Sequence, residues 1–303
     1  MIRCLLPFVT LVLLVWSTVS CARNPAPQGA GAESGRRSLR VMTFNIRHGQ
    51  TNAGCDEPAR TPGALPAPDC GLDLSQALDV IRAHAPDIVG LQEVDRFWAR
   101  SAMQDQPALI AKALDMPHTC YGANLDHQPD EHSDRPHQYG TLVLSRLPIL
   151  ECTTHRLPRV GDAETRGLTR ALVDVRGARL QFFNTHFHTA AADRRLQAPD
   201  VVEAIDTTAA PVILVGDFNA VPDAGELAPL FARFRDAWRE AAVAEPDNPE
   251  GATLPVHPSD PPRRRIDYVF VSEQVTVRSA RVPVDAKTRL ASDHYPIVVE
   301  VEW

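Results

Sequence analysis

The segment that most constrains the fold is an apolar run at residues 211–220 that ends in two polar side chains. Residues 212–215 are all aliphatic, which is typical of a strand buried on both faces. Gly216 interrupts the run, and Asp217 and Asn219 follow two positions apart, so their side chains point to the same side. A carboxylate can bind a metal or take a proton from water, and a carboxamide can donate to an oxyanion. The alternative for this pair is an Asx turn that closes a strand.

Other strand-like segments of the chain also carry polar residues at their ends. Residues 39–46, 87–95, 179–186 and 266–271 are apolar or alternate with period two, and residues 295–301 form a final strand-like run. A buried strand has no structural need for polar side chains at these positions, so we expect them to gather at one site. The polar residues in question are Asn45, Glu93, His186, Asp267, Asp293 and His294.

Each of these residues taken alone also has a structural explanation. Asn45 fits a turn, and Glu93 and Asp293 fit helix caps or exposed charges. His186 and His294 fit histidines whose hydrogen bonds are satisfied within the protein. Together, however, Asn45, Glu93 and Asp293 are hard oxygen ligands that suit Mg²⁺ or Mn²⁺. With histidine–carboxylate pairs for acid–base chemistry, the set indicates attack of water on phosphorus.

The remaining periodicity predicts one mixed α/β domain over residues 39–303, with many strands and with helices on the outside. Breaker residues without periodicity predict a surface loop at residues 47–73. No linker divides the domain, and a monomer is expected. Further strands are predicted at residues 139–150 and 171–175, and helices at residues 73–84, 107–114, 196–207 and 227–235.

The order of these segments resembles the endonuclease/exonuclease/phosphatase (DNase I-like) superfamily over nearly all of residues 39–303. The resemblance implies a four-layer α/β/β/α sandwich of two mostly antiparallel mixed β-sheets flanked by helices, with the active site at one end. The motifs that carry it are Thr43-Phe44-Asn45-Ile46, Leu91-Gln92-Glu93-Val94, Tyr139-Gly140 with Leu144-Ser145-Arg146, Asn184-Thr185-His186, Gly216-Asp217-Phe218-Asn219, Arg265-Ile266-Asp267-Tyr268 and Ser292-Asp293-His294.

The resemblance also implies roles for the matching residues. Glu93 is expected to be the principal ligand of Mg²⁺ or Mn²⁺, helped by Asn45 and Asp293. His294 is expected to act as a base or phosphate contact, held in one tautomer by Asp267.

For the other matching residues, Asp217 is expected to orient or deprotonate the attacking water, and Asn219 to hold a phosphoryl oxygen. His186 is expected to hydrogen-bond the phosphate or protonate the leaving group. Contacts to the substrate phosphate are expected from Tyr139, Arg166 and Arg265, because guanidinium groups bind phosphate well. For Arg265, part of the run Arg263-Arg264-Arg265, a solvated charge run is the alternative.

The superfamily acts on nucleic acids, phospholipid headgroups and small phosphate esters, so the fold alone does not choose the substrate. The loops at residues 49–73 and 245–265 and the His-rich stretch at residues 118–137 are expected to surround the site and to select the substrate. The formal net charge of −7 argues weakly against a broad basic surface for nucleic acid.

Two rival functions remain open. One is a zinc-dependent secreted hydrolase that uses His118, His127, His132 and His137, whose spacing does not match the HExxH pattern. The other is a catalytically silent binding module of the same fold, which would have no need of the full set of acidic residues and histidines.

The N-terminus is predicted to direct export. Residues 1–20 combine Arg3 with a short apolar core at residues 5–16, as in a signal peptide, and this core is too short to span a bilayer comfortably. The ending Thr18-Val19-Ser20-Cys21 resembles a bacterial lipobox, so Cys21 is expected to carry a lipid and to be the sole membrane attachment. Cleavage without a lipid is the alternative, and residues 21–38 are expected to be a flexible tether.

An oxidising compartment predicts disulfides among the remaining cysteines. Cys55, Cys70, Cys120 and Cys152 allow three pairings. We expect Cys55–Cys70, which would close a Pro-rich loop, and Cys120–Cys152, which would join two neighbouring strands. A zinc site is the competing interpretation, although no CxxC spacing is present.

Overall fold

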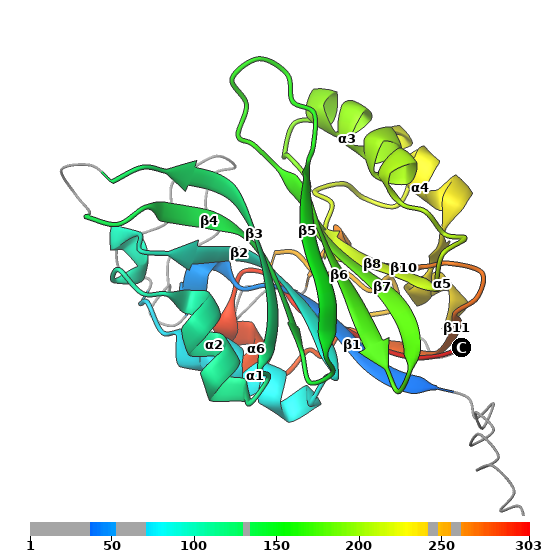
Figure 1. Cartoon of the computed structure of the whole chain (residues 1–303), viewed down its shortest axis with the longest axis horizontal. Helices are drawn as coiled ribbons and strands as arrows, with labels where there is room; N and C mark the ends of the chain where they lie inside the picture. The colour runs from blue at the N-terminus through cyan, green and yellow to red at the C-terminus, as the bar shows by residue number, and fades with distance from the viewer. Residues whose placement is uncertain (1–36, 53–70, 130–133, 242–247, 256–261) are drawn as a thin grey trace, which may run out of the picture. The chain divides into compact units, whose positions relative to one another are not determined.

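A computed structural model describes residues 37–52, 71–129, 134–241, 248–255 and 262–303, which belong to one compact unit. Two six-stranded sheets form its centre (Figure 1). The first sheet has the order β11-β12-β1-β2-β4-β3, and the second has the order β5-β6-β7-β8-β10-β9. In each sheet one pair of strands is parallel, β1 with β2 and β7 with β8, and the other pairs are antiparallel.

The strands of the first sheet are β1 (Ser38–Asn45), β2 (Ile88–Arg96), β3 (His118–His127), β4 (His137–Ser145), β11 (Thr276–Arg281) and β12 (Ile297–Glu302). Those of the second sheet are β5 (Ile149–Arg156), β6 (Gly167–Val175), β7 (Ala178–His186), β8 (Val212–Asp217), β9 (Arg235–Asp236) and β10 (Asp267–Val271). The helices are α1 (Leu74–His84), α2 (Gln106–Leu114), α3 (Ala191–Ala204), α4 (Ala228–Arg233), α5 (Ala237–Glu240) and α6 (Ala286–Ala291), with short 3-10 turns η1 (Arg47–Gly49), η2 (Ala99–Ser101) and η3 (Gly225–Leu227).

The alternation of side chains along the strands builds the layers. Alternate residues of both sheets, such as Val41, Val143, Phe182 and Val215, form one shared core between the sheets. The intervening residues of the first sheet pack on α1, α2 and α6, and those of the second sheet pack on α3 and α4. Helices therefore cover both outer faces (Figure 1), and the predicted α/β/β/α sandwich is confirmed.

Local signals set the ends of the helices. The Asp73 side chain accepts a hydrogen bond of 3.0 Å from the backbone N–H of Ser75 and so caps α1. The same helix ends at His84, and Ala85, which caps it, adopts the left-handed conformation just before Pro86. Asp105 caps α2, which has a proline in its first turn.

One prediction about strands is corrected by the structure. The single strand predicted at residues 139–150 is two strands, β4 and β5, which belong to different sheets. Pro148 stands between them and has no N–H for a sheet hydrogen bond. The His-rich stretch at residues 118–137 contains strand β3 and the start of β4, and neither the bounds of β3 nor β11 and α6 were predicted.

The disulfide Cys120–Cys152 is present, as predicted. It joins β3 to β5, which are edge strands of the two different sheets, with 5.4 Å between the Cα atoms. The bridge therefore ties the two sheets together along one side of the sandwich.

Several predictions about the termini and loops lie outside the described residues. They are the signal peptide at residues 1–20, the lipid at Cys21, nearly all of the tether and the pair Cys55–Cys70. Among the residues that the structure describes, no helix is both long enough and apolar enough to cross a membrane.

Candidate active site

The predicted polar residues meet where strands from both sheets end. Asp217 ends β8 and lies opposite His186 of β7 and Asp267 of β10 in the strand register. Asn45 ends β1 in the other sheet, and its side-chain Nδ2 lies 3.1 Å from Oδ2 of Asp217. The sequence prediction that strand ends converge is therefore confirmed for these four residues.

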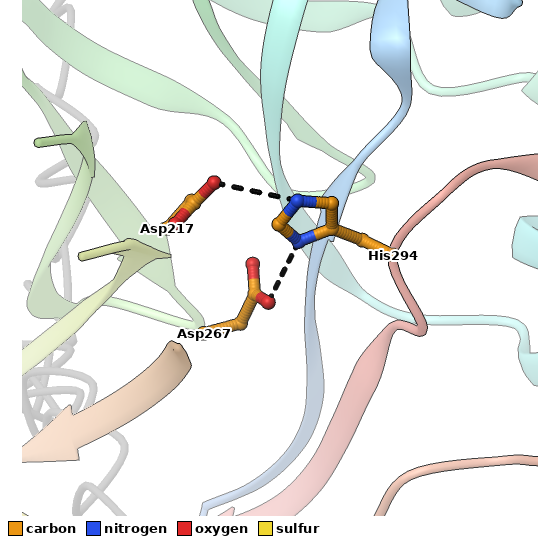
Figure 2. Close-up of side chains that lie close together, drawn as sticks. All are labelled: Asp217, Asp267 and His294. Carbon is orange, nitrogen blue, oxygen red and sulfur yellow. Dashed lines mark hydrogen bonds and ion pairs between the residues drawn. The ribbon is translucent and has the colours of Figure 1, made fainter. Parts of the chain in front are cut away.

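His294 lies between two carboxylates (Figure 2). Its Nδ1 is 2.9 Å from Oδ2 of Asp267, and its Nε2 is 3.7 Å from Oδ2 of Asp217. Asp267 Oδ2 also accepts a hydrogen bond of 2.5 Å from the Thr253 hydroxyl, which holds the carboxylate in place. All three side chains of Asp217, Asp267 and His294 are buried.

This arrangement shifts the pKa of two of its members. Burial alone would lower the pKa of His294, but the charges of Asp267 and Asp217 and the Asp267 hydrogen bond outweigh it, so this pKa lies well above 6.5. Burial, together with the neighbouring Asp267 charge, raises the pKa of Asp217 to about 7. The geometry thus provides a charged imidazole beside a carboxyl group that can exchange a proton near neutral pH.

His186 lies on the other side of Asp217, with 3.4 Å between its Nε2 and Oδ2 of Asp217. Burial and the nearby charge of Arg166 hold the pKa of His186 well below 6.5, so the ring is neutral at pH 7. A neutral ring favours the expected hydrogen-bonding role over protonation of a leaving group.

Glu93 owes its position to a β-bulge in β2. The pairing of β2 with β4 shifts register between Leu91 and Val94, and Glu93 has a backbone φ of 58°. A non-glycine residue adopts this conformation at a cost, and bulges commonly redirect side chains at functional sites. The carboxylate accepts a hydrogen bond of 3.0 Å from Asn45 Nδ2, and its Oε2 lies 3.6 Å from His48 Nδ1.

Glu93 is ionised at this position. Burial alone would raise the pKa of Glu93, but the neighbouring His48 side chain and the hydrogen bond from Asn45 lower it well below its usual value. His48 was not singled out from the sequence. In the sequence, the one sign of a role for His48 was its position three residues after Asn45. In the structure, its backbone φ of 45° indicates a strained conformation.

The side-chain amide of Asn45 faces the two carboxylates through its nitrogen, because Nδ2 donates to both Glu93 and Asp217. Its Oδ1 accepts the backbone N–H of Arg47 at 3.0 Å. In this structure Asn45 therefore offers hydrogens to the carboxylates, and not an oxygen to a cation.

Asp293 is partly exposed, and its Oδ2 lies 3.7 Å from Arg47 Nε.

Asn219 adopts a left-handed φ of 52° directly after Phe218, which is fully buried. Its backbone N–H donates to Asp217 Oδ1 at 2.9 Å, and its side-chain Nδ2 donates to the carbonyl of Phe187 at 2.9 Å. One side-chain hydrogen is thus used to fix the loop, and the second remains for the expected contact with a phosphoryl oxygen.

The three residues expected to contact phosphate differ in their surroundings. Tyr139 is buried, and burial and the charge of Glu93 raise its pKa well above 10. Arg166 is buried and forms an ion pair of 2.9 Å with Glu164 through Nη2, whereas its Nε and Nη1 have no hydrogen-bond partner among the described residues. Arg265 is also buried, but both terminal nitrogens bind Asp236, at 2.9 and 2.7 Å, which gives it a structural role.

The four histidines of the rival zinc hypothesis are not all brought together. His127 and His137 lie opposite each other on β3 and β4 and their rings stack at 5.1 Å. His118 lies at the other end of β3, and His132 lies outside the described residues.

Comparison with known proteins agrees with this geometry. A model of the endonuclease/exonuclease/phosphatase family matches residues 42–294. A solved structure of an endonuclease/exonuclease/phosphatase from Beutenbergia cavernae DSM 12333 is 28% identical, with a TM-score of 0.66 over 88% of this chain and 71% of that chain. The mannosyl-6-phosphatase of Bacteroides thetaiotaomicron is 20% identical, with a TM-score of 0.60 over 87% of this chain and 99% of that chain, and shows the same fold.

A curated relative, the protein cwh43 of Schizosaccharomyces pombe, is 27% identical over 140 residues. The match takes in 46% of this chain but 13% of that protein, so this chain corresponds to a small part of it. The matched family is named after endonucleases, exonucleases and phosphatases. These enzymes all cleave phosphate esters, so the match supports a phosphoester hydrolase.

Enzymes of this family typically depend on a divalent metal, and two groups of residues are candidates to hold it. Among the described residues, Asp217, Asp267 and His294 place one ligand atom each within 4.8 Å of one another. A metal ion at that position would have to displace a proton from His294, whose pKa lies above its usual value. The ionised Glu93 with Asp293 offers oxygen donors, which fit Mg²⁺ or Mn²⁺ better.

Proposed function

The chain belongs to the endonuclease/exonuclease/phosphatase family, and from that premise we propose that it is a phosphoester hydrolase that depends on Mg²⁺ or Mn²⁺. The observation that carries this proposal is the position of His294 between Asp267 and Asp217 at the end of the sandwich. A buried charged imidazole next to a carboxyl group with a pKa of about 7 suits proton transfer and anion binding in one place.

In this proposal Asp217 accepts the proton of the attacking water. Its raised pKa of about 7 makes it a stronger base than an ordinary carboxylate and leaves much of it ionised at neutral pH. The Asn219 N–H and the Asn45 amide hold its two oxygens, so the carboxylate is already oriented before water arrives.

His294 and Arg166 would stabilise the negative charge that develops on the phosphoryl oxygens. Asp267 fixes the His294 ring through Nδ1, which leaves Nε2 as the donor that faces the reaction. Nε and Nη1 of Arg166, which have no hydrogen-bond partner in the part of the chain that the structure describes, are donors for the same charge. The neutral His186 ring would donate a hydrogen bond to the phosphoryl group, and the Asn219 side chain would donate another.

Glu93 and Asp293 are the residues that would hold the metal ion, and Asn45 would position Glu93 through its hydrogen bond. A bound divalent ion supplies positive charge to the phosphoryl group and its leaving oxygen. In this assignment Asn45 is not a metal ligand, as expected from the sequence, but a residue that orients the ligand Glu93.

Hydrolysis of phosphomonoesters and phosphodiesters in the presence of Mg²⁺, Mn²⁺ or excess chelator tests the proposal. Asp217→Asn should reduce turnover by on the order of 10²-fold or more, because the amide cannot accept the proton. The matched control is Asp200→Asn, since Asp200 is a carboxylate paired with the exposed His155 at 2.7 Å. Equal turnover of the Asp217 variant and the parent enzyme would refute the assignment, and turnover that survives chelation would refute the metal dependence.

We also propose that the protein is exported and held at the cell envelope by a lipid on Cys21, with a monomeric catalytic domain. Support comes from the apolar N-terminal segment, the lipobox-like ending and the presence of a disulfide in the folded domain. A Cys21→Ser variant should be released from membranes on cell fractionation, and retention of that variant would contradict the anchor.

A further inference from the structure

The side chain of Gln106 binds two backbone groups on either side of Glu93 in the chain. Gln106 is the first residue of α2 and is fully buried. Its Oε1 accepts the backbone N–H of Asp95 at 2.9 Å, and its Nε2 donates to the carbonyl of His48 at 2.6 Å. Both ends of the carboxamide are therefore in use. One side chain joins the strand that carries Glu93 to the turn that carries His48.

The bond to Asp95 stabilises β2 where β1 no longer supports it. β1 ends at Asn45, which pairs with Gln92, so β1 does not pair with the part of β2 beyond Gln92. The bulge that contains Glu93 lies in this part, and Asp95 follows Glu93 by two residues. A buried N–H without an acceptor is destabilising, so the bond from Asp95 to Gln106 stabilises the bulged backbone.

The bond to His48 stabilises a turn that is itself strained. Arg47 and His48 both have a positive backbone φ, of 46° and 45°, which non-glycine residues adopt at a cost. The turn places His48 Nδ1 3.6 Å from Glu93 Oε2. Asn45 also joins the turn to the bulge, since its Oδ1 accepts from Arg47 and its Nδ2 donates to Glu93. Two carboxamides, those of Asn45 and Gln106, therefore hold the same turn and the same bulge.

Gln106 can fix these two segments because α2 is anchored in the core. Ile110 and Leu114 of α2 belong to the same apolar cluster as residues of β2, and α2 lies against the first sheet (Figure 1). Asp105, which caps α2, also forms an ion pair of 3.0 Å with Arg96 of β2. The start of α2 is thus held against β2 by several contacts, so the Gln106 side chain is in place before any ligand binds.

We propose that Gln106 is a positioning residue for the metal site, which holds the β2 bulge and the η1 turn together and so fixes the Glu93 carboxylate before an ion binds. This role rests on the proposed metal-dependent hydrolysis of phosphate esters. Gln106 contacts neither the ion nor the reacting atoms in this role and acts only through Glu93. Removal of residues that orient metal ligands typically lowers metal affinity by about 10- to 100-fold.

A calorimetric titration of the full chain with Mn²⁺ tests this role against a matched control. Gln106→Met keeps the length of the side chain but removes both hydrogen bonds, and it should weaken Mn²⁺ binding by on the order of 10-fold or more. The control is Gln181→Met, because Gln181 of β7 is also buried, accepts from Arg170 Nε at 3.0 Å and donates to the Asp206 carbonyl at 2.7 Å. This control should bind Mn²⁺ as the parent does. Unchanged affinity in Gln106→Met, or an equal loss in Gln181→Met, would overturn the role.

Hydrogen exchange without metal supplies a readout that depends on neither metal binding nor turnover. The Asp95 amide should exchange faster in Gln106→Met than in the parent, by on the order of 10-fold, because its acceptor is removed. In Gln181→Met the same amide should exchange as it does in the parent. Equal exchange of the Asp95 amide in all three proteins would overturn the role.

If Gln106→Met does not fold, Gln106→Glu replaces it. The carboxylate keeps an acceptor for the Asp95 N–H but cannot donate to the His48 carbonyl, so Mn²⁺ binding should weaken while the Asp95 amide stays protected. Equal or tighter binding in Gln106→Glu would then overturn the role.

The same measurements separate this role from the proposed function. If the parent binds no Mn²⁺, the proposed metal dependence fails, and the exchange of the Asp95 amide alone decides whether Gln106 positions the bulge. If the parent binds Mn²⁺ and Gln106→Met binds it equally well, the proposed function stands and the positioning role fails.

Discussion

His294 Nδ1 lies 2.9 Å from Asp267 Oδ2, and this contact decides which ring nitrogen faces Asp217. Both side chains are buried, although the two residues are 27 positions apart in the chain. The pair acts as one unit, because Asp267 both orients the ring and raises its pKa.

The first prediction concerns this pair. His294→Ala should reduce turnover by on the order of 10³-fold, because the charged donor is lost. Asp267→Asn should cost less, since an amide can still orient the ring. The two effects should be far from additive in the double variant, as expected of residues that act together. Turnover of both single variants and the double variant on one ester checks this, and losses that simply multiply would contradict the pairing.

The second prediction concerns stability and pH. The folded-state pKa of His294 is raised above 6.5, so its contribution to the free energy of unfolding is fully present below about pH 6.5 and is lost as pH rises through the folded pKa. To remove the coupled titration of Asp217, Asp217→Asn is compared with Asp217→Asn/His294→Gln in chelator. The stability advantage of the protein that keeps His294 should shrink from pH 6 towards pH 9 in urea unfolding. A constant or growing difference would contradict the raised pKa.

The third prediction concerns the metal. Glu93→Gln keeps the side-chain shape but removes the charge, so the affinity for Mn²⁺ should fall by on the order of 10-fold or more in a calorimetric titration. His294→Ala should bind Mn²⁺ at least as tightly as the parent protein, because it removes a positive charge without removing a ligand. If His294→Ala loses the metal while Glu93→Gln retains it, the ion is held by Asp217, Asp267 and His294 instead.

The fourth prediction concerns the disulfide between the two sheets. Cys120→Ala/Cys152→Ala should lower the free energy of unfolding by about 3–4 kcal/mol, because the bridge closes a loop across a sequence separation of 32 residues. Urea unfolding with and without reductant measures this loss. A further effect of reductant on the double variant would reveal a second bridge, as expected for Cys55 and Cys70, whereas equal stability of parent and variant would contradict the prediction.

The sequence by itself determined the main strands and the residues that gather at their ends. Aliphatic runs such as residues 212–215 are stable when they are buried as strands of a sheet. A polar residue at the end of such a run therefore lies where the strand ends. This local logic placed Asp217, His186 and Asp267 correctly. It failed for β3, whose inward positions carry Cys120, Gly122 and Asn124 in place of large apolar residues.

The tertiary structure alone decided how the collected residues pair. Bulges in β2 and β3 shift the register and redirect Glu93 and Asn124, and no periodicity in the sequence marks them. The amide nitrogen of Asn45 faces Glu93, which lies on a neighbouring strand, and Asp217, which lies in the other sheet. A residue expected to bind a cation is therefore a hydrogen-bond donor to two carboxylates. Hydrogen-bond partners and pKa values depend on distances between segments far apart in the chain, which are fixed only when the two sheets pack.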